Sequence, residues 1–269
     1  MSSVIDGDGA WTMDQADGLR RLFARTGCLV LPLVSNPHVQ GSGVAVERLT
    51  AVLALMGRKT LVVDAGETSP PPDEASVLGL APCIEYLSPT IAYLAAKGLP
   101  RRFVDTRGSA AHLLDELTRL VPDAQAVLLH ASAADLVRLC TGRTLRPMVL
   151  SSEDPESVKH AYAGMKLLVQ RSGWKSFDLV MMGPDRSERM ASIAATVGEC
   201  ADQFVGACLH DWAGIDELAP PQQPPERPPR TRAARASPPR TPQAACAGPL
   251  HLLGPPQMLL RPPRRQQRP

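Results

Sequence analysis

The sequence contains no uninterrupted run of about 18 apolar residues, which a membrane-spanning helix would require. The opening residues, MSSVIDGDGA, are polar and acidic, so no secretory signal with an apolar centre is predicted there. The six cysteines are scattered and lack the close spacing of a metal site. From these absences we expect a cytoplasmic protein with reduced cysteines, no metal ion and at most a peripheral contact with a membrane.

Aromatic residues make up only 4% of the chain, and the basic residues are unevenly distributed. From Ala219 to the end there are nine arginines, no lysine and a single acid, Glu226. Residues 1–218 are left with 20 basic and 26 acidic side chains and a net charge of −6. Because nucleic-acid binding depends on clustered positive charge and aromatic stacking, this acidic body predicts no specific nucleic-acid partner.

Residues 219–269 differ in composition from the rest of the chain. They contain 15 of the 27 prolines, and the repeated Pro-Pro, Pro-Arg and Arg-Pro pairs prevent both helices and sheet ladders. We therefore predict a disordered, extended tail. An adaptor function is one hypothesis, in which the arginines contact acidic lipid, nucleic acid or an SH3-like groove. A tail without function, or one that arose from a shifted reading frame, is the simpler alternative.

Short apolar segments alternate with longer amphipathic segments from residue 29 to residue 209. The segments predicted as strands are 29–34, 59–63, 102–105, 126–130, 147–150, 177–182 and 204–209. The segments predicted as helices are 44–56, 87–97, 109–120, 133–140, 156–170 and 186–200, with a further helical turn at 73–80. This alternation is typical of an α/β fold with a mostly parallel twisted sheet and helices on both of its faces.

A short amphipathic helix is predicted ahead of the first strand. Apolar residues recur at helical spacing from Met13 to Phe23, and Thr12 and Gln15 form a capping-box pattern. On spacing alone, the simplest interpretation is a helix that packs on its own domain.

The first strand, the glycine-containing loop after it and the following helix form a unit in which many proteins bind phosphate. Such loops bind through backbone N–H groups, a lysine, and a Ser or Thr hydroxyl that holds Mg²⁺. When the loop is aligned with this motif at Gly41, Ser42 stands at the position of the lysine and Gly43 at the position of the Ser or Thr hydroxyl. Pro37 stands where a deviant version of the motif carries its earlier lysine. We therefore predict a degenerate nucleotide loop with no ATP or Mg²⁺ cofactor and no catalytic residue, and Asp64 is the one retained carboxylate.

Several stretches resemble one known family. They are Asp14-Gln15-Ala16 with Leu19-Arg20, residues 57–65 (GRKTLVVDA), residues 150–166 (LSSEDPESVKHAYAGMK), and residues 200–207 (CADQFVGA) with 210–213 (HDWA). Over roughly residues 11–217, the chain is similar to the FlhG branch (also called FleN or YlxH) of the MinD/ParA-type P-loop ATPases. In that branch a DQAxxLR helix precedes the strand of the phosphate loop.

The resemblance implies a cytoplasmic regulator of flagellar number and placement, recruited to the cell pole or the flagellar base. It implies that residues 1–26 bind an FlhF-type signal-recognition GTPase and stimulate its GTP hydrolysis. The residues that would make this contact are Asp14, Gln15, Ala16, Leu19 and Arg20, with Gln15 nearest the partner's nucleotide. Residues 27–218 would form a MinD-like domain. A homodimer and a working ATPase switch with a divergent loop stay as alternatives.

Overall fold

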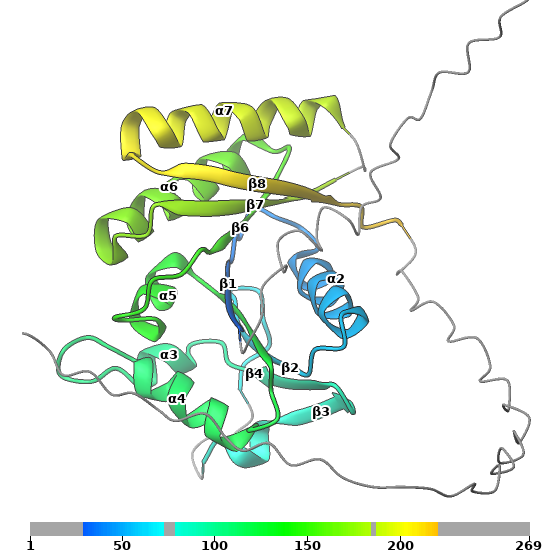
Figure 1. The fold of residues 1–269 in the computed structure, drawn as a ribbon, viewed down its shortest axis with the longest axis vertical. Coiled ribbons are helices and arrows are strands. Elements are labelled where there is room, and N and C mark those ends of the chain that lie inside the picture. The colour runs from blue at the N-terminus through cyan, green and yellow to red at the C-terminus, as the bar shows by residue number, and fades with distance from the viewer. Residues whose placement is uncertain (1–28, 73–78, 184–186, 220–269) are drawn as a thin grey trace, which may run out of the picture. The chain divides into compact units, whose positions relative to one another are not determined.

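The computed structural model describes residues 29–72, 79–183 and 187–219. These residues form an eight-stranded sheet with the strand order β3-β4-β2-β5-β1-β6-β7-β8 (Figure 1). The strands are β1 (Leu29–Val34), β2 (Thr60–Ala65), β3 (Glu85–Ser88), β4 (Ile91–Ala95), β5 (Ala126–Ala131), β6 (Met148–Ser152), β7 (Ser176–Met182) and β8 (Cys208–Ile215). Neighbouring strands are parallel, except that β3 runs antiparallel to β4 at one edge.

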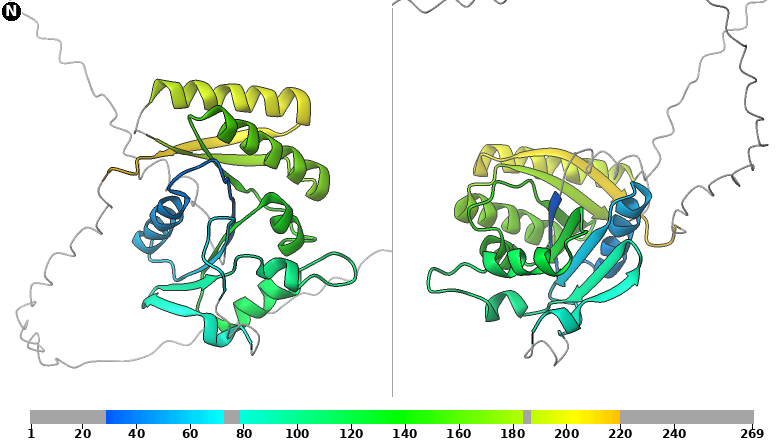
Figure 2. Two further views of the ribbon diagram at one scale, coloured as in Figure 1. Left: turned by 180° about the vertical axis from the view of Figure 1, so that it is seen from behind. Right: turned by 60° about the horizontal axis from the view of Figure 1, so that its bottom comes forward.

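The helices of the described residues lie on both faces of this sheet. They are α2 (Ser42–Leu55), the short α3 (Leu99–Arg102), α4 (Ala111–Leu120), α5 (Ala133–Leu139), α6 (Pro155–Ser172) and α7 (Glu188–Val205), with a 3₁₀ turn at Ala81–Cys83. Helix α2 covers one face, and α4, α5, α6 and α7 cover the other (Figures 1 and 2). The expected α/β class with a mostly parallel sheet and helices on both faces is confirmed.

Two apolar cores follow from this arrangement. On one face, Leu49 and Leu53 of α2 pack among buried residues of the strands, including Leu33 and Leu128. On the other face, the buried sides of α4 to α7 share a larger core with the remaining strand residues. Because β1, β2 and β5 have helices on both sides, they are almost continuously apolar, as central parallel strands usually are.

The central strands carry the residues of the candidate site to one edge of the sheet. In the parallel register, His130 of β5 lies beside Leu33 of β1 on one side and beside Asp64 of β2 on the other. Side chains of register partners on adjacent strands point to the same face. The carboxyl ends of β1, β2 and β5 therefore bring Asp64 and His130 together on the face that α2 covers.

The predicted helix at 87–97 is wrong. This segment contains the second half of β3 and all of β4, joined by a tight turn at Pro89-Thr90. Leu87, Ile91 and Leu94 fit helical spacing, but in β4 alternate residues are buried, as in a strand with one side toward a core. Spacing over so few residues cannot distinguish the periodicity of a helix from that of a strand.

Two further predictions near helix ends are also wrong. Residues 102–105 are not a strand, because α3 ends at Arg102 and the Asp105 carboxylate accepts hydrogen bonds from the backbone N–H groups of Arg107 and Ser109 in a turn. Phe204 does not begin the last strand, because it lies in the final turn of α7, and β8 begins only at Cys208. Most of the predicted helical turn at 73–80 lies outside the described residues.

Other expectations can be compared with the described part of the chain. Its cysteines, Cys83, Cys140, Cys200 and Cys208, are free thiols. No cluster of metal-binding side chains was found in the described ranges. None of the helices between residues 29 and 219 that the structure describes is long and apolar enough to span a membrane. The predicted partner-binding segment 1–26 and the predicted tail 219–269, apart from Ala219, lie outside those ranges.

Candidate functional site

The loop between β1 and α2 lies at the carboxyl edge of the sheet and is anchored by Asn36. This side chain is 2% exposed, and its amide nitrogen donates to the carbonyl oxygens of Leu150 and Ser157, both at 2.9 Å. Its amide oxygen accepts from the backbone N–H of His38 at 3.1 Å. The anchor ties the loop to β6 and α6. Gly41 then reverses the chain with a φ of 72°, which favours glycine, and α2 begins at Ser42.

No lysine or arginine occurs between Ser35 and Gly43. Pro37 has no backbone N–H to offer, and the hydroxyl of Ser42 lies 3.0 Å from the hydroxyl of Thr68, with which it shares a hydrogen bond. Gly43 is the second residue of α2 and is exposed. The loop therefore presents backbone and neutral side chains toward the start of α2.

A carboxylate of the protein itself lies against this loop. The side chain of Glu217, just after β8, is so close to Gly41 that a Cβ atom at position 41 would collide with the carboxylate. Helix α2 has no acidic residue in its first turn and no side-chain cap. The amino end of a helix carries a partial positive charge, so Glu217 supplies a negative charge where one is favourable.

Asp64 is the centre of a buried hydrogen-bond cluster on the α2 face. One carboxylate oxygen accepts from the hydroxyl of Ser69 and pairs with Nδ1 of His130 at 2.7 Å. The other accepts from the hydroxyl of Tyr93 at 3.1 Å. Burial alone would raise the pKa of Asp64, but the hydrogen bonds from His130 and Ser69 outweigh it and the pKa is lowered. Asp64 is therefore ionised at neutral pH.

The charge of Asp64 fixes the roles of its partners. An ionised carboxylate only accepts hydrogen bonds, so Nδ1 of His130 must carry a proton. Burial, followed by the nearby charge of Asp64, raises the pKa of Tyr93, which keeps this phenol protonated as a donor. His130 is 1% exposed, and its other ring nitrogen, Nε2, has no hydrogen-bond partner within the described residues.

The close approach of His130 depends on Gly66. A Cβ atom at this position would lie 2.8 Å from both Nδ1 of His130 and the hydroxyl of Ser69. Such separations are too short for carbon against these atoms. Glycine at position 66 therefore leaves the space in which the Asp64 cluster forms.

The fold can be compared with solved structures. No protein-family model matches the chain, and no curated protein matches its sequence. A protein described as a plasmid partition protein, from Borrelia burgdorferi B31 and bound to AMPPNP, matches with a TM-score of 0.50 and 9% identity, covering 71% of this chain and 88% of that one. The two proteins share a fold.

Further structures are similar with lower scores. Apo McdA from Cyanothece has a TM-score of 0.49 and 13% identity over 70% of this chain and 86% of its own. MinD from Aquifex aeolicus has a TM-score of 0.45 and 12% identity over 67% of this chain and 80% of its own.

The structure brings some of the sequence-predicted residues together. Ser42, Gly43 and Asp64 line the same cavity. Gly41 adjoins Ser42 at the start of α2. The predicted partner-binding residues Asp14, Gln15, Ala16, Leu19 and Arg20 lie outside the described residues.

Sequence reasoning missed His130, Ser69, Tyr93 and Glu217. The sequence alone gives His130 no role, because its pairing with Asp64 depends on β2 and β5 being neighbours. A polar residue near the end of an otherwise apolar strand was the available signal. Glu217 carried no local signal, since it follows the last strand and reaches the loop only through the fold.

Proposed function

We propose that this protein is an FlhG-like regulator of flagellar number and placement. In this proposal residues 11–23 bind an FlhF-type GTPase and stimulate its GTP hydrolysis, and the chain does not hydrolyse ATP itself. The DQAxxLR pattern at Asp14 to Arg20 and the further family-like stretches support the first part. The α/β fold shared with the plasmid partition protein is consistent with it.

The observation that carries the second part is the chemistry of the loop at residues 35–43. ATP and Mg²⁺, which the resemblance implies, do not fit the residues present. A triphosphate needs fixed cations, and this loop has none. The carboxylate of Glu217 lies against Gly41, where it would repel a phosphate. The hydroxyl of Ser42, at the lysine position, is hydrogen-bonded to Thr68.

A divergent but working ATPase switch, acting as a homodimer, is the alternative. The likeness of the fold to a protein solved with AMPPNP favours it. Binding of ATP·Mg²⁺ separates the two hypotheses. We expect no thermal shift of the purified full chain with ATP·Mg²⁺, and a clear shift at micromolar ATP would favour the ATPase.

A restored loop provides the positive control for that measurement. The triple variant Ser42→Lys, Gly43→Thr, Glu217→Gln returns the lysine and the hydroxyl and removes the opposing charge. We expect it to show a thermal shift with ATP·Mg²⁺ that the single variant Glu217→Gln lacks. If Glu217→Gln alone bound ATP·Mg²⁺ as well as the triple variant, the missing lysine would not be the reason for weak binding.

The partner is tested with FlhF from the same organism. We expect the full chain to retain FlhF in a pull-down and to accelerate its GTP turnover. Gln15→Ala should lose most of the acceleration, because Gln15 is the polar group expected nearest the partner's nucleotide. Gln170→Ala, which changes an exposed glutamine of α6, is the matched control and should behave as wild type. If neither binding nor turnover responds to Gln15→Ala, the partner-facing role of the segment is wrong.

A further inference from the structure

A cavity of about 560 Å³ lies between α2 and the strands β2 and β4. Small-molecule sites in proteins usually have volumes of about 300–1,000 Å³. The walls of this cavity are largely apolar, with Val46 and Ala51 on α2 and with Val62 and Ile91 on the strands. The Asp64 cluster also contributes to its lining. An apolar cavity with a few converging polar groups is the usual form of a ligand site.

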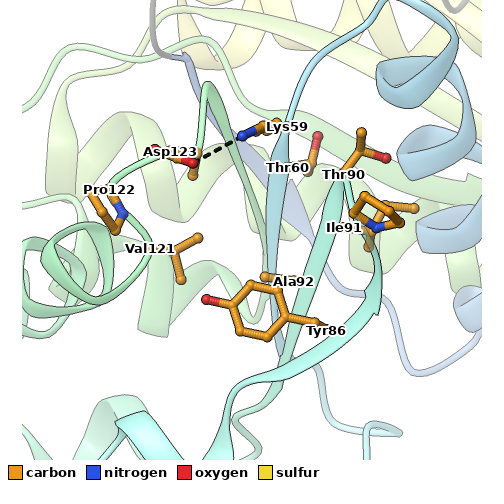
Figure 3. Close-up of a pocket in the computed structure, with 11 residues that line it drawn as sticks. Lys59, Thr60, Tyr86, Thr90, Ile91, Ala92, Val121, Pro122 and Asp123 are labelled. Atoms are coloured by element: carbon orange, nitrogen blue, oxygen red, sulfur yellow. Dashed lines mark hydrogen bonds and ion pairs between the residues drawn. The ribbon is translucent and has the colours of Figure 1, made fainter.

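A second, smaller cavity lacks these features. It has a volume of about 200 Å³ and lies where β2 and β4 begin (Figure 3). Its cation, Lys59, is paired with Asp123 at 2.9 Å, and both side chains are largely exposed. The larger cavity is therefore the candidate for a ligand.

His130 lines the larger cavity, and only one of its two ring nitrogens is hydrogen-bonded within the described residues. Among the described lining residues, Nε2 of His130 is the buried side-chain nitrogen or oxygen without a partner. Since Nδ1 faces Asp64, the nitrogen without a partner is the one on the other side of the ring. A buried polar atom without a partner is costly, so a ligand that hydrogen-bonds this nitrogen would be stabilised there.

The charges around the cavity select the sign of the ligand. Asp64 and Glu47 both line it, and no lysine or arginine does so among the described residues. Glu47 is exposed on α2, which places its carboxylate at the open side of the cavity. A ligand with a negative charge would be repelled by both carboxylates, and a cation would be attracted.

We infer that this cavity binds a small organic amine, with its ammonium group attracted by the carboxylates of Asp64 and Glu47 and its apolar body lying along Val46, Ala51 and Ile91. Glu47 attracts the cation at the entrance. Ser42 and Gly43 of the nucleotide loop also line this cavity. The inference does not rest on the proposed FlhF partner.

Two probes that share one apolar body test the sign of the charge. Tryptamine carries an indole ring and an ammonium group, and indole-3-propionate carries the same ring and a carboxylate. We expect tryptamine to bind the full chain at least about tenfold more tightly in a calorimetric titration. We also expect it to shift the ring-nitrogen NMR signals of His130. Equal affinity for the two probes, or no binding of tryptamine at millimolar concentration, would overturn the inference.

Two variants locate the binding. Ala51→Phe fills the cavity from α2 without touching the Asp64 cluster, and it should abolish tryptamine binding. Ala54→Phe makes the same change on α2 outside the cavity lining and should leave binding unchanged. Glu47→Gln removes only the exposed charge and should weaken tryptamine binding by roughly threefold. If tryptamine bound Ala51→Phe as tightly as Ala54→Phe, it would be binding elsewhere and the inference would fail.

Discussion

Asp64 is held in place by donors from three different segments of the chain. His130 comes from β5, Tyr93 from β4 and Ser69 from the loop after β2. Each donates to the carboxylate, so the cluster satisfies a buried charge without any metal or nucleotide. The residue that the sequence marks as a retained nucleotide-site carboxylate thus has a structural role in the fold.

The charge of Asp64 should contribute measurably to stability. Asp64→Asn replaces a carboxylate, which only accepts hydrogen bonds, with an amide. The NH₂ group of that amide would face a side chain that is itself a donor. We expect it to lower the free energy of unfolding at pH 7 by about 2 kcal/mol, as for hydrogen bonds to a charged group. Urea unfolding monitored by circular dichroism measures this. The exposed Asp123→Asn is the control and should change it by no more than about 0.5 kcal/mol.

The difference in stability between wild type and Asp64→Asn should depend on pH. The pKa of Asp64 is lower in the folded chain than its ordinary value of 3.8, so protons bind preferentially to the unfolded chain. The stability that the charge provides is therefore present above pH 3.8 and is lost as the pH falls through the lower, folded pKa. The difference in unfolding free energy between wild type and Asp64→Asn should shrink over that range. A difference that grew on acidification would contradict the direction of the pKa shift.

Gly66 and Gly43 should respond oppositely to the same substitution. Gly66→Ala forces a Cβ atom against His130 and Ser69 and should cost about 1–3 kcal/mol, as overpacking does. Gly43→Ala meets no atom within 4 Å and lies in a helix, so it should stabilise the fold by about 0.5 kcal/mol. Thermal unfolding of the two variants checks both signs. Destabilisation by Gly43→Ala equal to that by Gly66→Ala would show that the space around His130 is not the cause.

At the scale of elements, the loop from Ser35 to Gly41 owes its position to Asn36. This amide donates to two carbonyl groups and accepts from His38, so it uses both its donor and its acceptor atoms. The loop is therefore rigidly connected to β6 and α6 even though it lacks the cations of a phosphate site. The position of the loop therefore depends on its anchor and not on a bound ligand.

Substitutions of Asn36 should distinguish a lost hydrogen bond from an opposing charge. Asn36→Ala removes the hydrogen bonds of this buried amide to the carbonyl groups of Leu150 and Ser157 and to His38, and we expect it to lower the unfolding free energy by about 2 kcal/mol. Asn36→Asp places a carboxylate against the same carbonyl groups and should cost about 3 kcal/mol or more at pH 7. Chemical unfolding of both, with the exposed Gln40→Glu as the amide-to-acid control, measures the difference. If Asn36→Asp were the milder change, the amide would not be acting as a donor.

The strands and helices were predicted unevenly from the sequence, for physical reasons. The strand at Leu29–Val34 was predicted at its observed bounds, because a central parallel strand is continuously apolar and ends in a loop rich in turn residues. The β3–β4 hairpin was predicted as a helix, because one face of it is solvated and the spacing of its apolar residues fits a helix as well as a strand. The residues of the candidate site also differ in whether the sequence marks them locally. Gly41 and Asp64 have local signals, whereas the pairing of Asp64 with His130 requires the strand order.

At the scale of the whole molecule, the proposed function gives the described domain the role of a scaffold. The described residues form an α/β domain whose nucleotide loop lacks cations and faces Glu217. In the proposed function, this domain supports a segment near Gln15 that acts on a GTPase partner. Such a protein would act on its partner without an ATP-dependent switch of its own.

The most direct test is the rate of GTP turnover by FlhF with the full chain added, measured with and without ATP·Mg²⁺. The account predicts the same acceleration in both conditions, because the chain's own loop does not bind the nucleotide. FlhF alone, with and without ATP·Mg²⁺, is the control for any direct effect on the partner. Acceleration only in the presence of ATP·Mg²⁺, or no acceleration at all, would contradict the account.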